Sequence, residues 1–205
     1  RPVDPNELVA RSLTQVRRKH YNDRLRSSVR ETIELAVTDG LTGLHNRRYL
    51  DNHLKVLIER AVARGRPLSV CITDIDRFKS VNDTYGHDCG DVVLTEIAKR
   101  LKYFMRGKGY AVRWGGEEFL LVFPEFHIDE AEEVMNEFIH ELDAHSVSYK
   151  EETEVHITMT FGIVEAGEQF ANIDSMVSGA DRRLYIGKQN GRNQIVAEEQ
   201  SEQDL

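Results

Sequence analysis

The chain has 205 residues, of which 40% are hydrophobic and 30% charged, and its formal net charge at pH 7 is −8. This composition provides enough apolar material for a core and excludes a largely disordered chain. The acidic net charge disfavours nucleic acid as a partner, because phosphate backbones are bound by basic surfaces.

No membrane span or signal peptide is predicted, since the longest clear apolar run extends only from Phe119 to Phe123. The two cysteines, Cys71 and Cys89, are too few for a disulfide framework. Together these features favour a reducing, cytoplasmic setting.

The first 37 residues differ in charge from the rest of the chain. Residues 1–30 carry a net charge of +5 and residues 31–205 one of −13, which marks a boundary. Apolar residues at helical spacing predict a helix over about 6–37, interrupted near 20–22. Its narrow apolar stripe suits packing against a second helix. The basic residues are most simply a solvated helix face, with contact to nucleic acid or membrane as the alternative.

From residue 38 onward the pattern is that of an α/β domain, to about 197, followed by a frayed acidic tail at 198–205. The predicted order is β-α-β-β-α-β, a ferredoxin-like arrangement in the α+β class. Its elements are a strand at 68–75, a helix at 92–104, strands at 111–114 and 119–123 joined through Gly115-Gly116, a helix from Asp129 with Glu132 as a capping box, a half-buried strand at 155–163, a helix at 174–188 and a short strand at 194–197.

Two acidic clusters stand out against this framework. Asp74 and Asp76 end an apolar strand, and residues two apart project from the same side of a strand, so both carboxylates could approach one cation. Glu117 and Glu118 follow two glycines in the predicted hairpin, where a divalent cation would offset their repulsion. If the two strands are neighbours, Asp74 and Glu117 meet at one metal site. Solvated carboxylates at strand and turn ends remain the alternative for each cluster.

The segment between the clusters, 78–91, is rich in Asn, Asp and Gly. A carboxylate can accept hydrogen bonds from the Watson–Crick edge of guanine, and an amide can address its O6 or N3. A loop in which Asp88 or Asp91 caps the next helix explains the same residues.

Four segments in the right order resemble the GGDEF domain, the catalytic module of diguanylate cyclases. They read DGLTGLHNRRYL at 39–50, DIDRFKSVNDTYGHDCGD at 74–91, RWGGEEF at 113–119 and YIGKQNGRNQIV at 185–196. The resemblance covers about three-quarters of the chain. It implies that two GTP molecules, one on each of two antiparallel domains, condense to cyclic di-GMP with release of two pyrophosphates.

The resemblance also implies a role for particular residues. Two Mg²⁺ ions per site, or Mn²⁺ in their place, would be held by two carboxylates and a main-chain carbonyl, with a further carboxylate assisting activation of the 3′-hydroxyl. The residues at the matching positions are Asp74, Glu117 and the carbonyl of Ile75 for the metal; Glu118 for activation; Asn82 and Asp91 for guanine; Leu41 for a wall of the base pocket; Phe78 and Lys79 for main-chain contacts to phosphate; and Lys188 and Arg192 for the terminal phosphates.

Two positions refine this expectation. Asp91 is a carboxylate where ATP-using relatives often carry serine, which favours selectivity for GTP. Many relatives have the pattern Arg-x-x-Asp shortly before the Gly-Gly-Glu-Glu-Phe signature, which is at 115–119 here. In those relatives the product binds at the Arg-x-x-Asp site and inhibits the enzyme. This chain has Arg106 but Gly109 in place of the aspartate, so product inhibition is expected to be weak or absent.

Residues 1–20 resemble the end of a receiver domain of a response regulator. This implies that the upstream part is receiver-like and that residues 1–37 pair with their twin in a homodimer, bringing two GGDEF domains together. Two other functions stay open from the sequence: a non-catalytic module that binds GTP or cyclic di-GMP, and a structural dimerisation unit.

Overall fold

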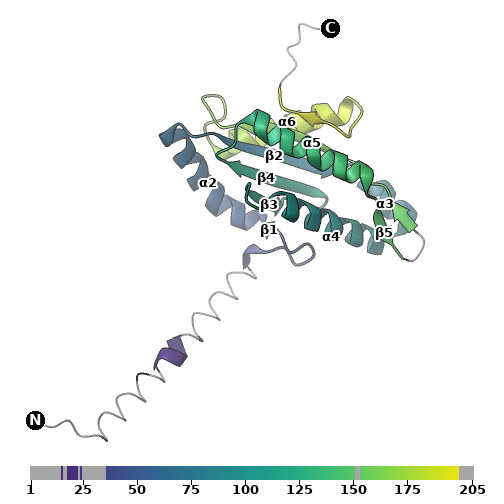
Figure 1. Ribbon diagram of the computed structural model, residues 1–205, viewed down its shortest axis with the longest axis horizontal. Coiled ribbons are helices and arrows are strands. Elements are labelled where there is room, and N and C mark those ends of the chain that lie inside the picture. The colour runs from purple at the N-terminus through teal and green to yellow at the C-terminus, as the bar shows by residue number, and fades with distance from the viewer. Residues whose placement is uncertain (1–14, 16–17, 23, 25–35, 151–152, 199–205) are drawn as a thin grey trace, which may run out of the picture. The chain divides into compact units, whose positions relative to one another are not determined.

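The structure of the protein is a computed structural model that describes residues 15, 18–22, 24, 36–150 and 153–198. The chain divides into two compact units, Arg1–Val37 and Thr38–Leu205. The elements of the second unit (Figure 1) are β1 (His45–Asn46), α2 (Arg47–Arg64), β2 (Leu68–Ile75), α3 (Phe78–Tyr85), α4 (His87–Phe104), β3 (Tyr110–Arg113), β4 (Glu118–Pro124), α5 (Ile128–Ala144), β5 (Val147–Tyr149), β6 (Thr153–Val155), β7 (Met159–Glu165), α6 (Ile173–Gln189) and β8 (Ile195–Val196).

A six-stranded sheet in the order β1-β3-β4-β2-β7-β8 forms the centre of this unit. The pairs of β2 with β4 and β7, and of β3 with β4, are antiparallel, whereas β1–β3 and β7–β8 are parallel. The inner order β3-β4-β2-β7 is that of a ferredoxin-like β-α-β-β-α-β unit. The predicted fold class is therefore confirmed.

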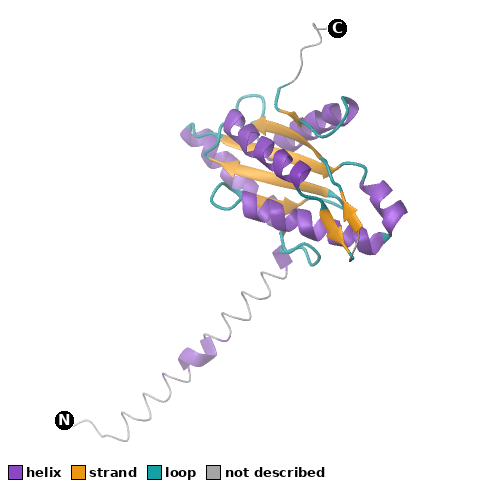
Figure 2. Ribbon diagram, turned by 45° about the vertical axis from the view of Figure 1, so that its right-hand side comes forward, coloured by secondary structure: helices purple, strands orange, loops and turns teal. Residues whose placement is uncertain are grey.

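Helices cover both faces of the sheet (Figure 2). Helices α4 and α5 pack on one face, against residues such as Cys71, Ile75 and Phe119. Helices α2 and α6 pack on the other, against Val70 and Ile72 among others. Because side chains alternate along a strand, β2 contributes to both cores and is buried along its whole length.

The largest difference from the predicted elements lies at 155–163. The strict alternation there predicts one half-buried strand. The structure breaks it at 156–158, pairs β6 with β5 in a separate two-stranded sheet and buries β7 almost entirely between the helices. Alternation alone could not reveal the break, because both pieces keep the period of two.

Several smaller predictions were wrong or incomplete. Residues 78–85 form a helix rather than a loop, and α4 begins at His87 after Gly86, so neither Asp88 nor Asp91 is its cap. Helix α5 begins one residue before Asp129, and its capping box joins His127 and Glu130. Helix α2 and strands β1 and β5 were not predicted at all.

The predicted helix over 6–37 and the acidic tail fall mostly outside the described residues. Those described before Thr38 are helical. Within the described part of the chain, no helix is long and apolar enough to cross a membrane. The domain boundaries at 37/38 and 197/198 stay predictions of the sequence.

Candidate functional site

The carboxylate of Asp74 lies at the end of β2, on the face of the sheet that α6 covers. Asp74 is 8% exposed and its Oδ2 lies 3.0 Å from the Nζ of Lys188 on α6. Helix α6 approaches this closely because β7 carries Gly162, where a Cβ would stand 2.1 Å from the carbonyl oxygen of Ala180. The packing of the helix on the sheet therefore places Lys188 against Asp74.

Two further carboxylates belong to the same neighbourhood. Glu118 is the cross-strand partner of Asp74 in the β2–β4 ladder, and the carbonyl of Glu117 accepts a hydrogen bond from the N–H of Ile75 at 3.3 Å. Burial raises the pKa of Asp74 to about 6, with the charges of Glu117 and Glu118 acting in the same direction and Lys188 opposing them. The hairpin thus places two acidic groups near Asp74, and their charges disfavour the ionised form of the Asp74 carboxylate.

This donor set fits a magnesium ion that is shared with phosphate oxygens. Among the described residues, no group of three or more His, Cys, Asp or Glu side chains could hold a metal ion by itself. Mg²⁺ needs only one or two carboxylates when phosphates and water complete its shell. Asp74, Glu117 and the main-chain carbonyl of Ile75 are the residues here that would supply the protein's share.

Asp76 does not join this cluster, contrary to the prediction that both carboxylates of the Asp-x-Asp pair could approach one cation. Its carboxylate accepts hydrogen bonds from Thr160 Oγ1 at 2.7 Å, Thr158 Oγ1 at 2.9 Å and the N–H of Asn193 at 3.0 Å. Asp76 follows the last residue of β2, where the strand alternation that the prediction assumed no longer applies.

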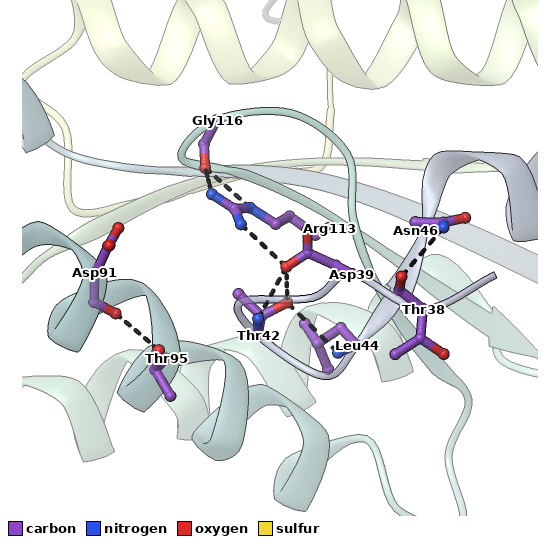
Figure 3. Close-up of polar contacts among 9 residues, drawn as sticks. All are labelled: Thr38, Asp39, Thr42, Leu44, Asn46, Asp91, Thr95, Arg113 and Gly116. Atoms are coloured by element: carbon purple, nitrogen blue, oxygen red, sulfur yellow. Dashed lines mark hydrogen bonds and ion pairs between the residues drawn. The ribbon is translucent and has the colours of Figure 1, made fainter. Parts of the chain in front are cut away.

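The turn between β3 and β4 contains Gly115 and Gly116 and is called the signature turn below. Hydrogen bonds connect it to the loop at 39–44 (Figure 3). The guanidinium of Arg113 lies 3.0 Å from Asp39 Oδ1 and donates to the carbonyl of Gly116 at 2.8 Å. Thr42 donates to Asp39 through its N–H and its hydroxyl. Burial alone would raise the pKa of Asp39, but the hydrogen bonds from Thr42 and Arg113 lower it below its usual value.

Two adjacent glycines in a hairpin can allow a tight turn, but Gly115 acts here through the side chain that it lacks. Neither Gly115 nor Gly116 has a positive φ, so a tight left-handed turn is not their reason. At Gly115 a Cβ would stand 2.9 Å from Glu118 Oε2. This glycine therefore makes room for the carboxylate of Glu118. Leu41, the predicted wall of a base pocket, lies in the loop that Arg113 ties to the turn, and it is 37% exposed.

The two predicted guanine-reading residues lie on successive helices, Asn82 on α3 and Asp91 on α4. Asn82 Oδ1 is buried without a hydrogen-bond partner, and Asp91 is exposed. Gly90 brings the helices together, because a Cβ there would stand 2.1 Å from Asn82 Oδ1 and 3.1 Å from the ring of Phe78. A buried, unpartnered amide oxygen is costly unless a ligand or water satisfies it.

The residues predicted for phosphate contacts lie at two chain segments. Phe78 and Lys79 are the first residues of α3, after Arg77 in the left-handed conformation (φ 55°), so their N–H groups belong to the unsatisfied first turn of a helix. Lys188 is on α6, but that helix ends at Gln189 and Arg192 follows it in a turn at φ 67°. A spacing of four residues would place Lys188 and Arg192 on one face of a continuous helix, but the helix ends between them, so this expectation is wrong.

The segment with the incomplete Arg-x-x-Asp pattern is a turn between α4 and β3. The N–H groups of Lys108 and Gly109 both donate to the carbonyl of Met105 at 3.0 Å. A Cβ at Gly109 would stand 1.9 Å from the backbone oxygen of Val122. The backbone of β4 thus fills the space that an aspartate side chain would need.

Comparison with known proteins agrees with this geometry. The family described as "Diguanylate cyclase, GGDEF domain" matches residues 36–194, and the chain belongs to this family. It is 39% identical over 197 residues to the response regulator PleD of Caulobacter vibrioides, and the alignment covers 96% of this chain and 43% of that protein. It is 37% identical over 160 residues to diguanylate cyclase DgcZ of Escherichia coli, covering 77% of this chain and 52% of that one. The chain thus spans about half the length of these curated relatives.

Two solved structures share the fold. The coiled coil and GGDEF domain of DgcB from Caulobacter crescentus, solved in complex with c-di-GMP, has a TM-score of 0.80 at 29% identity, covering 94% of this chain and 98% of that one. The active GGEEF domain of a diguanylate cyclase from Vibrio cholerae has a TM-score of 0.71 at 32% identity, covering 77% and 99%.

Sequence reasoning missed the residues that hold the site together. Asp39 and Arg113 lie within the matched motifs, yet their spacing of 74 residues gives no local pattern that predicts an ion pair. Gly90 and Gly162 act by lacking a side chain, and only the packing of neighbouring elements reveals it. The burial of Asp76 with three hydrogen-bond donors could not be predicted either, because all three donors lie more than 80 residues away in the sequence.

Proposed function

We propose that the chain is the catalytic part of a diguanylate cyclase that condenses two GTP molecules into cyclic di-GMP and two pyrophosphates. The observation that carries this proposal is the convergence of Asp74, Glu117 and Glu118 beside Lys188. Three carboxylates against one ammonium leave an excess of negative charge that divalent cations would offset, and the same cations would bind the phosphates of the nucleotide.

Each GTP would lie across the end of the sheet that carries these groups. Asn82 and Asp91 bind guanine, and a carboxylate at 91 favours guanine over adenine, because it accepts from N1–H and N2–H₂. Leu41 forms a wall for the base, and the first N–H groups of α3, at Phe78 and Lys79, meet phosphate oxygens. GTP is therefore the preferred substrate.

The phosphates would be held between the cations of the protein and the metal. Lys188 and Arg192 bind the terminal phosphates, and their positive charges stabilise the negative charge of the departing pyrophosphate. Asp74, Glu117 and the carbonyl of Ile75 hold Mg²⁺, two ions per site, with Mn²⁺ as a substitute. When bound there, the metal would supply Lewis-acid polarisation of the α-phosphate and the 3′-hydroxyl. Glu118 accepts the proton of that hydroxyl.

One domain holds one GTP, so the reaction needs two copies facing each other. We assign the pairing to residues 1–37, as the end of a receiver-like domain that precedes the catalytic domain in a cytoplasmic response regulator. The match of PleD, a response regulator, to 96% of this chain supports this architecture. Product inhibition is weak or absent, because Gly109 provides no carboxylate and the carbonyl of Val122 leaves no space for one.

The test is synthesis of cyclic di-GMP by the purified chain from GTP and Mg²⁺ at several protein concentrations. A rise steeper than linear with protein supports a dimeric cyclase. Absence of product, even after a dimerising coiled coil replaces residues 1–37, would favour the alternative of a module that only binds GTP or cyclic di-GMP. The complete set of acids at 74, 117 and 118 argues against that alternative.

A further inference from the structure

Asp76 is a buried carboxylate that the metal cluster does not use. It is 7% exposed, and its three hydrogen-bond donors, Thr158 Oγ1, Thr160 Oγ1 and the N–H of Asn193, are all neutral. Its own N–H donates to the carbonyl of Thr158 at 2.9 Å. Burying a carboxylate in this way costs free energy, which three good hydrogen bonds offset. The arrangement therefore needs a reason beyond filling space.

The contact to Asn193 falls in an unusual turn. Gly191, Arg192 and Asn193 follow one another with φ of 114°, 67° and 46°. For non-glycine residues the left-handed conformation costs about 1 kcal/mol or more each. Two of the contacts in this turn are the hydrogen bond from the N–H of Arg192 to the carbonyl of Gly187, at 3.0 Å, and the bond from Asn193 to Asp76. Asp76 thus compensates for a conformation that the sequence alone would not favour.

We propose that Asp76 is a positioning residue that holds the turn at 191–193 and so places Arg192 beside Lys188 for the terminal phosphates of the nucleotide. This rests on the proposed function for the role of Arg192. Asp74 and Asp76 would then each position one of the two cationic side chains. Asp74 contacts Lys188, at the end of α6, and Asp76 contacts the turn that follows the same helix. The Asp-x-Asp pair fixes both cations relative to strand β2.

The variants that test this are Asp76→Ala and Arg192→Ala, alone and combined, with Thr158→Val as the matched control. Thr158→Val removes one hydrogen bond of Asp76 but leaves the bond to Asn193 intact. Binding of GTP and of GMP is measured in Mg²⁺ for each variant, because GMP lacks the phosphates that Arg192 would hold. Hydrogen exchange at the N–H of Asn193 reports on the turn without any nucleotide.

We expect Asp76→Ala to weaken GTP binding about 10-fold and GMP binding less than about 2-fold, and to speed exchange at Asn193. Arg192→Ala should show the same nucleotide pattern, and the double variant should bind GTP no more weakly than Arg192→Ala alone. Thr158→Val should leave both readouts near the original protein. Equal loss for both nucleotides, additive losses in the double variant, or unchanged exchange at Asn193 would overturn the proposal.

If Asp76→Ala does not fold, Asp76→Asn decides, since it keeps the shape but has one acceptor oxygen for three donors. The proposal requires faster exchange at Asn193 and a lower ratio of GTP to GMP affinity in this variant. If either readout is unchanged, the proposal is contradicted. A parent protein that makes no cyclic di-GMP defeats the proposed function, whereas these two readouts still decide the role of Asp76.

Discussion

The two sides of the candidate site are built by different physical means. On the side proposed for the phosphates, position is set by polar contacts: Lys188 with Asp74, and Asp76 with the N–H of Asn193. On the side proposed for guanine, it is set by the missing side chain of Gly90, which lets α4 approach Asn82 on α3. Polar contacts weaken gradually when one partner is changed, but a steric gap is lost with a single added methyl group. The two sides should therefore fail in different ways.

The largest effect should come from the carboxylates at the boundary of both sides. In the proposed function Asp74→Asn and Glu117→Gln would each remove a metal ligand, and cyclic di-GMP synthesis should then fall by a factor of about 100 or more. Product formation from GTP, with circular dichroism to verify folding, measures this. Synthesis at an undiminished rate in either variant would contradict the metal assignment.

Asp74→Asn should lower activity, but it should not lower the stability of the folded protein at neutral pH. Because the folded state raises the pKa of Asp74 to about 6, it binds the proton more tightly than the unfolded state does. The free energy of unfolding should therefore fall as pH rises from about 4 to about 6, by on the order of 2–3 kcal/mol. In EDTA, Asp74→Asn should lose this pH dependence and be at least as stable at pH 7.5. Urea unfolding across this pH range tests it, and an identical pH profile for both proteins would refute the assignment.

The next largest effect should fall on the guanine side alone. Gly90→Ala puts a Cβ against Asn82 Oδ1 and the ring of Phe78, so the amide must move. We expect KM for GTP to rise about 10-fold, with discrimination against ATP reduced. Gly167→Ala is the matched control, because a Cβ there meets nothing within 4 Å. Equal kinetics for the two variants would show that Gly90 does not position Asn82.

A smaller effect is expected where the loop at 39–44 meets the signature turn. Asp39→Asn weakens the ion pair with Arg113, which is 16% exposed and donates to the turn. Since the folded state lowers the pKa of Asp39, the carboxylate contributes stability above pH 3.8 that is lost as pH falls below it. Unfolding at pH 7 should be easier by about 1 kcal/mol, and activity should fall a few-fold. A variant with unchanged stability and activity would show that this tie is dispensable.

The smallest effect on activity is expected at the turn before β3. Gly109→Asp restores the residue of the Arg-x-x-Asp pattern, yet the carbonyl of Val122 occupies the place of its Cβ. We expect a loss of stability of about 1–3 kcal/mol from the displaced backbone and no gain of product inhibition. Titration of cyclic di-GMP into the assay measures this. Strong inhibition of the variant by cyclic di-GMP would mean that the backbone of β4 moves aside easily to admit the aspartate side chain.

The sequence predicted the buried strand β2, the hairpin and the ferredoxin-like order, because a continuous apolar run and Gly115-Gly116 are local patterns. It missed α3, since Asn82, Asp83 and Gly86 favour turns and only packing on α4 makes that segment helical. Among site residues, the acids stood out because carboxylates beside buried strands are rare. The roles of Asp76 and Arg113 could not be predicted, because each depends on contacts with distant segments. The role of Gly90 depends on how two successive helices pack against each other.

The measurement that tests the central claim most directly is cyclic di-GMP formation from GTP as a function of protein concentration, with Mg²⁺ present and then removed by EDTA. The account predicts product that rises more steeply than in proportion to protein and disappears with EDTA. Product that persists without a divalent cation, or a rate per chain that stays constant down to protein concentrations at which the chain is monomeric, would contradict a metal-dependent reaction between two domains.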